Sequence, residues 1–124
     1  MNGRQPGVRY EGGPDQCAWW AIDQFHACSG LYPNLRNPAN NGNAMHWVTN
    51  ASYNYWTVVS TPRVHSIAVF PLRTNGAGPV GHVAWVTGVS AGNITITKMN
   101  YAAWNTVDTR TLTPAASVRY ILAP

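Results

Sequence analysis

Residues 82–99 read HVAWVTGVSAGNITITKM, and this stretch decides which fold the chain is expected to adopt. Apolar residues recur through both halves of it in short runs that are typical of strands. Between the halves, Ser90-Ala91-Gly92-Asn93 has the composition of a tight turn. The stretch therefore predicts an antiparallel hairpin. Strand alternation puts His82 on one face of this hairpin and Trp85 on the other.

The hairpin is expected to lie within a larger antiparallel sheet that follows two helices. Asp15 can cap a helix whose apolar stripe runs through Ala27 and which Gly30 ends. A second helix is expected from Asn43 to about Ser52. Strand-like runs then follow at residues 57–59, 67–70, 82–89, 94–99, 107–112 and 118–122. This order predicts an α+β fold in which N-terminal helices pack on a C-terminal antiparallel sheet.

The length of 124 residues is enough for one hydrophobic core but not for two. We therefore expect a single domain over residues 1–124, with residues 1–10 as an extended lead-in. Apolar residues make up 45% of the chain, which favours a packed core over disorder. Charged residues make up only 10%, and Asn, Thr, Ser and Gly supply most of the polarity, which suits an extracellular or cell-wall setting.

Charge and hydropathy argue against several partners. Eight Lys plus Arg against four Asp plus Glu give a net charge of +4, but the basic residues are scattered, so no nucleic-acid partner is expected. No run of about 18 apolar residues is present, so no membrane span is expected. Residues 1–15 lack the apolar core of a signal peptide. The chain is therefore expected to be part of a longer exported protein, or to be released by another route such as phage lysis.

The two cysteines are expected to be unpaired. If one helix spans both, Cys17 and Cys28 lie about 16 Å apart, whereas a disulfide needs Cα atoms within roughly 7 Å. No group of cysteines, histidines or carboxylates has the spacing of a metal site, so we expect no metal and no other cofactor. Cys28 is expected to be a packing residue, and His26, His46 and His65 are expected to serve the surface or packing.

Cys17 is the first candidate for chemistry. It lies in Gln16-Cys17-Ala18-Trp19-Trp20, where a polar segment becomes an apolar helix. The positive end of the helix dipole favours a thiolate at this position, and the free backbone amides there can receive an oxyanion. The alternative is that Cys17 is a small buried hydrophobe, as many free cysteines are.

His82 and Asn100 are the candidate partners of this thiol. His82 opens the first strand of the hairpin after a Gly-rich segment, so its ring can lie at the edge of a cleft. Pairing through the turn puts Asn100 near residue 83, where its amide oxygen can hold one imidazole nitrogen. Lys98 shares that strand face by period 2. The alternatives are a strand-end His bonded to a backbone carbonyl and an Asn that simply ends a strand.

Several segments, in unbroken order, resemble the CHAP family, named for cysteine, histidine-dependent amidohydrolase/peptidase. They are Gln16-Cys17-Ala18-Trp19, Gly42-Asn43-Ala44, Pro62 to Phe70, Gly81 to Val86, Ile94 to Tyr101 and the closing Ser117 to Leu122. The resemblance implies a papain-like α+β fold. It also implies cleavage of an amide bond in bacterial peptidoglycan, by a muramoyl-alanine amidase or by a stem or cross-bridge endopeptidase.

The resemblance assigns roles to residues. It implies that Cys17 is the nucleophile, His82 the general base and acid, and Asn100 a polar residue of the site. Residues expected to contact substrate are Gln16, Trp19, Trp20, Trp85, Lys98 and Trp104. For each tryptophan, packing in the core is the alternative.

The resemblance also implies a setting. Family members are phage lysins, tail lysins and bacterial cell-wall hydrolases, so peptidoglycan is the expected partner and the cell exterior or wall the expected location. The chain is expected to be a monomer or one domain of a larger protein. The family's calcium loop is not expected here, because Glu11 to Asp15 holds too few carboxylates.

One residue departs from the family pattern. Lys98 stands where the family usually has a Glu that orients the His, and a cation cannot accept the imidazole proton. Either Asn100 takes over that role, or the site is weakened and the domain is a non-catalytic wall-binding or virion structural domain. A third hypothesis keeps the Cys-His chemistry but directs it to a small-molecule amide or makes the domain an interbacterial toxin.

Overall fold

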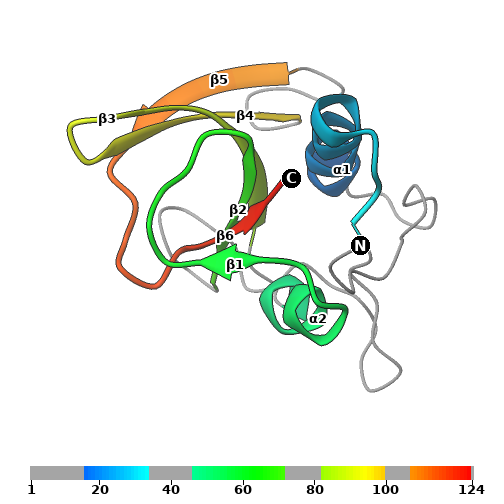
Figure 1. Cartoon of the computed structure of the whole chain (residues 1–124). Helices are drawn as coiled ribbons and strands as arrows, with labels where there is room; N and C mark the ends of the chain where they lie inside the picture. Colours follow the sequence, from blue (N-terminus) through cyan, green and yellow to red (C-terminus); the bar gives the residue numbers. More distant parts are fainter. Residues whose placement is uncertain (1–15, 34–45, 72–81, 100–106, 124) are drawn as a thin grey trace.

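The computed structural model of the protein describes residues 16–33, 46–71, 82–99 and 107–123 (Figure 1). Side chains are described for residues 20–33, 46–71, 82–97 and 109–123. The helices are α1 (Gln16–Ser29) and α2 (Trp47–Tyr53). The strands are β1 (Val58–Val59), β2 (Ser66–Phe70), β3 (His82–Ser90), β4 (Asn93–Met99), β5 (Val107–Leu112) and β6 (Arg119–Leu122).

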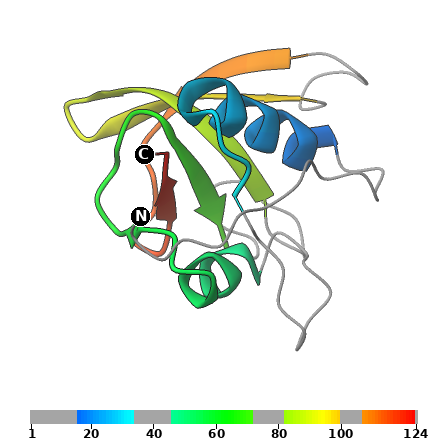
Figure 2. The same ribbon diagram turned by 45° about the vertical axis from the view of Figure 1, so that its right-hand side comes forward.

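The strands form one six-stranded antiparallel sheet in the order β1-β6-β2-β3-β4-β5. Both helices pack on the same face of it, with α1 against β3 and β4 and α2 near β6 and β1 (Figures 1 and 2). The predicted α+β class, with helices on an antiparallel sheet, is confirmed. Each strand begins and ends within one or two residues of the run that predicts it.

The core has two parts because both faces of the central strands are buried. On the helix face, side chains from α1, α2, β2, β3 and β6 form one cluster, which contains Val83 and Trp85. On the opposite face, side chains from the strands and from Val118 form a second cluster, which contains Ala84 and Val86. The predicted alternation along β3 is therefore confirmed, and it assigns Trp85 to the space beneath α1.

Helix α1 is held by an apolar stripe at helical spacing. Ala21, Ile22 and Phe25 are at most 3% exposed. The Phe25 ring makes edge contacts with two tryptophan rings, at centroid distances of 5.4 and 6.3 Å, and its burial contributes about 2–3 kcal/mol. Gly30 has a φ of +77° and its amide bonds the carbonyl of His26 at 2.7 Å, so the helix ends where predicted.

The expectation for Cys28 was wrong. Its thiol is exposed and free, although helical spacing from Phe25 points it toward the core. The neighbouring Ala27 and Leu31 are exposed as well. The last turn of α1 thus extends beyond the part of the sheet that covers the helix, which periodicity within the helix does not reveal.

The described helix α2 begins at Trp47, with His46 as its N-cap residue, and ends at Tyr53. The predicted helix from Asn43 to Ser52 agrees at its end, while its first three residues lie outside the described residues. The side chains of Trp47 and Ala51 are buried in the helix-face cluster.

The predicted hairpin forms, with Ser90 paired to Asn93. Ala91 and Gly92 have φ values of +52° and +82°, the pattern of a two-residue type I′ turn. A β-bulge between Val86 and Gly88 then shifts the register by one residue, so that Trp85 pairs with Thr97. Uninterrupted pairing, on which the placement of Asn100 near residue 83 relied, does not hold beyond the bulge.

Candidate active site

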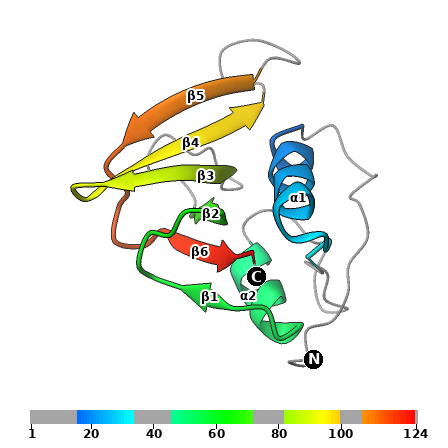
Figure 3. The same cartoon turned by 45° about the horizontal axis from the view of Figure 1, so that its top comes forward.

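The first turn of α1 is held against the end of β4. The indole Nε1 of Trp20 donates a hydrogen bond of 2.9 Å to the hydroxyl of Thr97. This bond joins residues 77 positions apart in the chain. Figure 3 shows the N-terminal end of α1 near the arrowhead of β4. Cys17, the second residue of α1, is therefore anchored at this end of the sheet.

His82 begins β3 at the same end of the sheet. Because Trp85 pairs with Thr97, the start of β3 lies beside the end of β4. The His82 side chain is half-buried, and its ring centroid lies 6.0 Å from that of Phe70, its register partner in β2. The fold thus brings the backbones of Cys17 and His82, distant in sequence, to one end of the domain.

For several other residues predicted to act in catalysis or substrate binding, the structure describes the backbone alone or nothing. Gln16 and Trp19 are described as helical backbone in α1, and Lys98 as strand backbone in β4. Asn100 and Trp104 lie outside the described residues.

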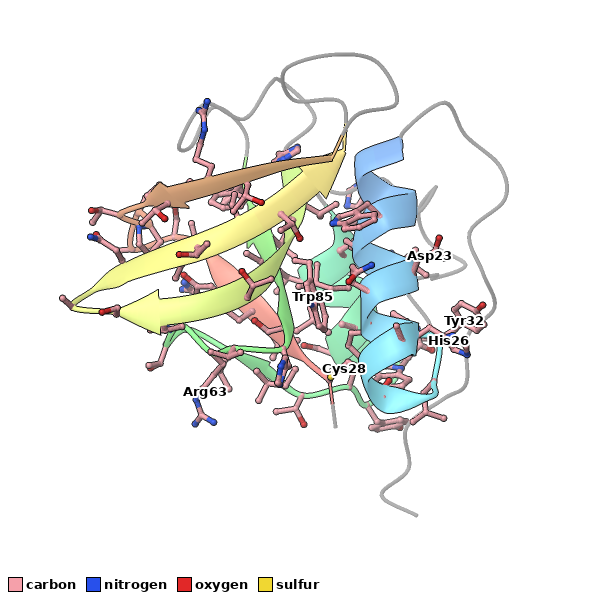
Figure 4. All side chains as sticks on the ribbon, turned by 90° about the horizontal axis from the view of Figure 1, so that it is seen from above. Asp23, His26, Cys28, Tyr32, Arg63 and Trp85 are labelled. Carbon is pink, nitrogen blue, oxygen red and sulfur yellow. The ribbon has the colours of Figure 1, made fainter. Side chains whose placement is uncertain are left out.

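Two of the predicted substrate tryptophans contribute to packing. Trp20 is half-buried and packs against the helix-face cluster. Trp85, expected as a wall of the cleft, is 4% exposed and lies between the sheet and α1 (Figure 4). The reason is strand alternation: Trp85 points to the face that α1 covers.

Sequence reasoning missed Asp108. In the register of β4 and β5, Lys98 pairs with Asp108. A residue directly opposite on an antiparallel strand is the nearest cross-strand neighbour, with Cβ atoms about 4.5–5.5 Å apart. Lys98, which stands where the family usually has a Glu, is thus paired in the register with an aspartate. No local pattern shows this pairing, because it depends on where β5 joins the sheet.

His26 and His65, which were expected to serve packing or the surface, both stack on aromatic rings. The His26 ring stacks on Tyr32 with centroids 3.9 Å apart, on the outer side of α1 (Figure 4). The exposed His65 stacks on Trp85 at 6.4 Å. Among the residues that the structure describes, no group of three or more His, Cys, Asp and Glu side chains could hold a metal ion. In the same part of the chain, no helix is long and apolar enough to cross a membrane.

Residues 7–100 match the sequence model of the CHAP domain. The chain belongs to the CHAP domain family. The resemblance seen in its motifs is thereby confirmed. The chain is 37% identical, over 81 residues and 64% of its length, to the probable autolysin LDP of Staphylococcus aureus (strain NCTC 8325 / PS 47).

Solved structures show the same fold. An N-acetylmuramoyl-L-alanine amidase from Staphylococcus aureus superposes with a TM-score of 0.73 over 89% of this chain, at 28% identity. The crystal structure of Ly7917 gives a TM-score of 0.51 over 73% of this chain at 23% identity, a likeness of fold alone. The chain covers 27% of the autolysin, 31% of the amidase and 41% of Ly7917.

Proposed function

We propose that this CHAP domain is a peptidoglycan hydrolase that cleaves an amide bond, with Cys17 as its nucleophile. The observation that carries the proposal is the hydrogen bond between Trp20 and Thr97, which anchors the first turn of α1 at the end of the sheet where His82 begins β3. The relatives support the substrate class, because they include a probable autolysin and an N-acetylmuramoyl-L-alanine amidase.

In the proposed reaction, the Cys17 thiolate attacks the amide carbonyl and forms a tetrahedral intermediate. Backbone amides at the start of α1, assisted by the Gln16 side chain, stabilise the oxyanion. The C–N bond breaks as protonated His82 gives its proton to the leaving amine, which leaves a thioester on Cys17. Neutral His82 then takes a proton from water, whose oxygen attacks the thioester and releases a carboxylic acid and the thiolate.

We propose Asn100 as the residue that orients His82. The support is the register of Trp85 with Thr97, which brings the end of β4 beside the start of β3, and the chemistry of an amide oxygen, which can accept the imidazole N–H. Asp108 is opposite Lys98 in the register, and we propose that its carboxylate offsets the charge of that lysine. On this proposal Lys98 contacts carboxylate groups of the substrate and does not weaken the site. Trp19 and Trp104 are proposed to line the substrate cleft.

The setting is proposed with the activity. A domain that cuts peptidoglycan acts at the cell wall or outside the cell, as part of a phage lysin, a tail lysin or a bacterial autolysin. Both amidase and endopeptidase cleavage fit the chemistry. The domain is proposed to act as a monomer, alone or within a larger protein.

The experiment compares clearing of purified peptidoglycan by the unmodified chain, Cys17→Ala and Cys28→Ser. Cys17→Ala is expected to lose at least about 10³-fold in rate, as enzymes do when a covalent nucleophile is removed. Cys28→Ser is the matched control, because its thiol is exposed on the last turn of α1, and it is expected to keep its activity. Clearing that survives Cys17→Ala would refute the nucleophile. Mass spectrometry of the fragments distinguishes an amidase from an endopeptidase.

The second candidate function is non-catalytic wall binding on the same fold, and Lys98 is the observation that favours it. A chain that binds peptidoglycan but releases no fragments would establish it. The variant Lys98→Glu tests whether Lys98 is the reason for a lack of cleavage. A rate gain greater than about tenfold would show that the natural site lacks an orienting carboxylate, whereas our proposal expects no gain.

A further inference from the structure

Uncharged polar side chains occupy the helix-side face of β4 and β5, and we call this set the threonine face. Thr95 is opposite Thr111 and Thr97 is opposite Thr109 in the register. The set comprises Asn93, Thr95, Thr97, Thr109, Thr111 and Thr113.

These side chains form cross-strand pairs that are open to solvent. The hydroxyls of Thr95 and Thr111 are hydrogen-bonded at 3.1 Å, and the Thr113 hydroxyl donates to Asn93 Oδ1 at 2.6 Å. Thr109, Thr111 and Thr113 are exposed. One bond between two hydroxyls uses one hydrogen, so the Thr95–Thr111 pair keeps a donor and several acceptor positions for a ligand.

The side chains that the structure describes on this face carry no charge. The ionisable residues of the two strands, Lys98, Asp108 and Arg110, fall on the other face by period 2, where Arg110 pairs with the buried Ile96. β5 is an edge strand, and proteins commonly place charges on edge strands to prevent association. Here the charges lie on one face, and the other keeps hydroxyls that can both donate and accept.

The threonine face is continuous with the proposed active-site end. Thr97 belongs to it and accepts the hydrogen bond from Trp20, the fifth residue of α1. In Figures 3 and 4 the helix lies at the end of β4, and the rest of β4 and β5 extends away from it. A chain-like ligand lying on the face would therefore reach the start of α1.

We propose that the threonine face docks the glycan strand of peptidoglycan while an amide of the attached peptide enters the site of Cys17 and His82. This inference rests on the proposed function, which supplies the substrate class. Sugar hydroxyl and acetamido groups donate and accept hydrogen bonds, as threonine hydroxyls do, and the methyl groups of the threonines cover the apolar side of a sugar ring. The neutral face suits a polymer that carries no charge on its sugars once its lactyl groups are in amide linkage.

The experiment measures binding to purified peptidoglycan sacculi free of teichoic acid, in the Cys17→Ala background so that no bond is cut. The face variant replaces Thr95, Thr109 and Thr111 with Val, which keeps the shape and removes the hydroxyls. It is expected to bind at least about tenfold more weakly, since three hydrogen bonds are lost.

Two matched variants control this comparison. The Ser triple at the same positions keeps the hydroxyls and is expected to bind as the parent does. A second Val triple, at the exposed Thr49, Thr57 and Thr61, makes the same chemical change away from the face and is also expected to bind normally. Undiminished binding by the face variant, or equal loss in the Ser triple or in the Thr49, Thr57 and Thr61 triple, overturns the proposal.

A second measurement covers the case in which the face variant does not fold. Peptide-free glycan strands are added to the Cys17→Ala chain, and backbone amide shifts are followed by NMR. Shifts concentrated on β4 and β5 support docking, and shifts elsewhere or none at all refute it. Neither assay requires turnover. Failure of the proposed function is tested separately: it would appear as peptidoglycan that stays uncut by the chain with Cys17 intact.

Discussion

The hydrogen bond between Trp20 and Thr97 gives the sharpest test of how the site is assembled. The 2.9 Å bond joins a half-buried indole N–H to a half-buried hydroxyl. Thr97→Val keeps the shape of the side chain and leaves this N–H without its acceptor, which costs about 1–2 kcal/mol of unfolding free energy. For a chain of this length, such a loss lowers Tm by roughly 3–8 °C.

A double-mutant cycle isolates the bond itself. Urea denaturation of Thr97→Val, Trp20→Phe and the double variant is expected to give a coupling free energy of about 1 kcal/mol. Thr109→Val is the control, because Thr109 is the exposed register partner of Thr97, and its change should stay within about 0.5 kcal/mol. Additivity of the two single changes within about 0.3 kcal/mol would show that the bond does not anchor α1.

Three further predictions concern the hairpin turn, the core cluster on the sheet face opposite the helices, and the core cluster on the helix face. Ala91 has a φ of +52° before Gly92, so Ala91→Asn is expected to stabilise the fold by about 1 kcal/mol in urea denaturation; a loss would contradict the type I′ assignment. Burial raises the pKa of Tyr120 despite a nearby arginine, so stability should be constant below about pH 10 and fall above it. Thermal melts across pH should show a smaller alkaline fall in Tm for Tyr120→Phe than for the unmodified chain. An equal fall in Tm would show that ionisation of Tyr120 does not cause the loss of stability. Phe25→Ala should cost about 3–5 kcal/mol, and a loss under about 1 kcal/mol would mean that its site is not tightly packed.

Much of the fold could be predicted from local patterns. The helix that ends at Gly30, the alternation along β3 and the tight turn at residues 90–93 are properties of neighbouring residues, because side-chain period and backbone propensity act over a few positions. The family could also be recognised, because the segment around Cys17 and the segment around His82 occur in the expected order.

The candidate site depended on contacts that no local pattern contains. A bulge before Gly88 changed the register, and a glycine inside a predicted strand was the one signal of it. Trp85 belongs to the core because α1 covers its face of the sheet, which no pattern within the strand predicts. Asp108 became a neighbour of Lys98 only through the pairing of β4 with β5.

The sequence by itself determined the elements, their order and the identity of the residues that can do chemistry, since these follow from short-range spacing. The tertiary structure alone decided that the first turn of α1 lies at the end of β4, beside the start of β3, through the bond from Trp20 to Thr97. Packing of distant segments selects one register and one helix position from many that have the same local pattern. For that reason, local sequence patterns do not determine the arrangement at the ends of the sheet, where the proposed chemistry lies.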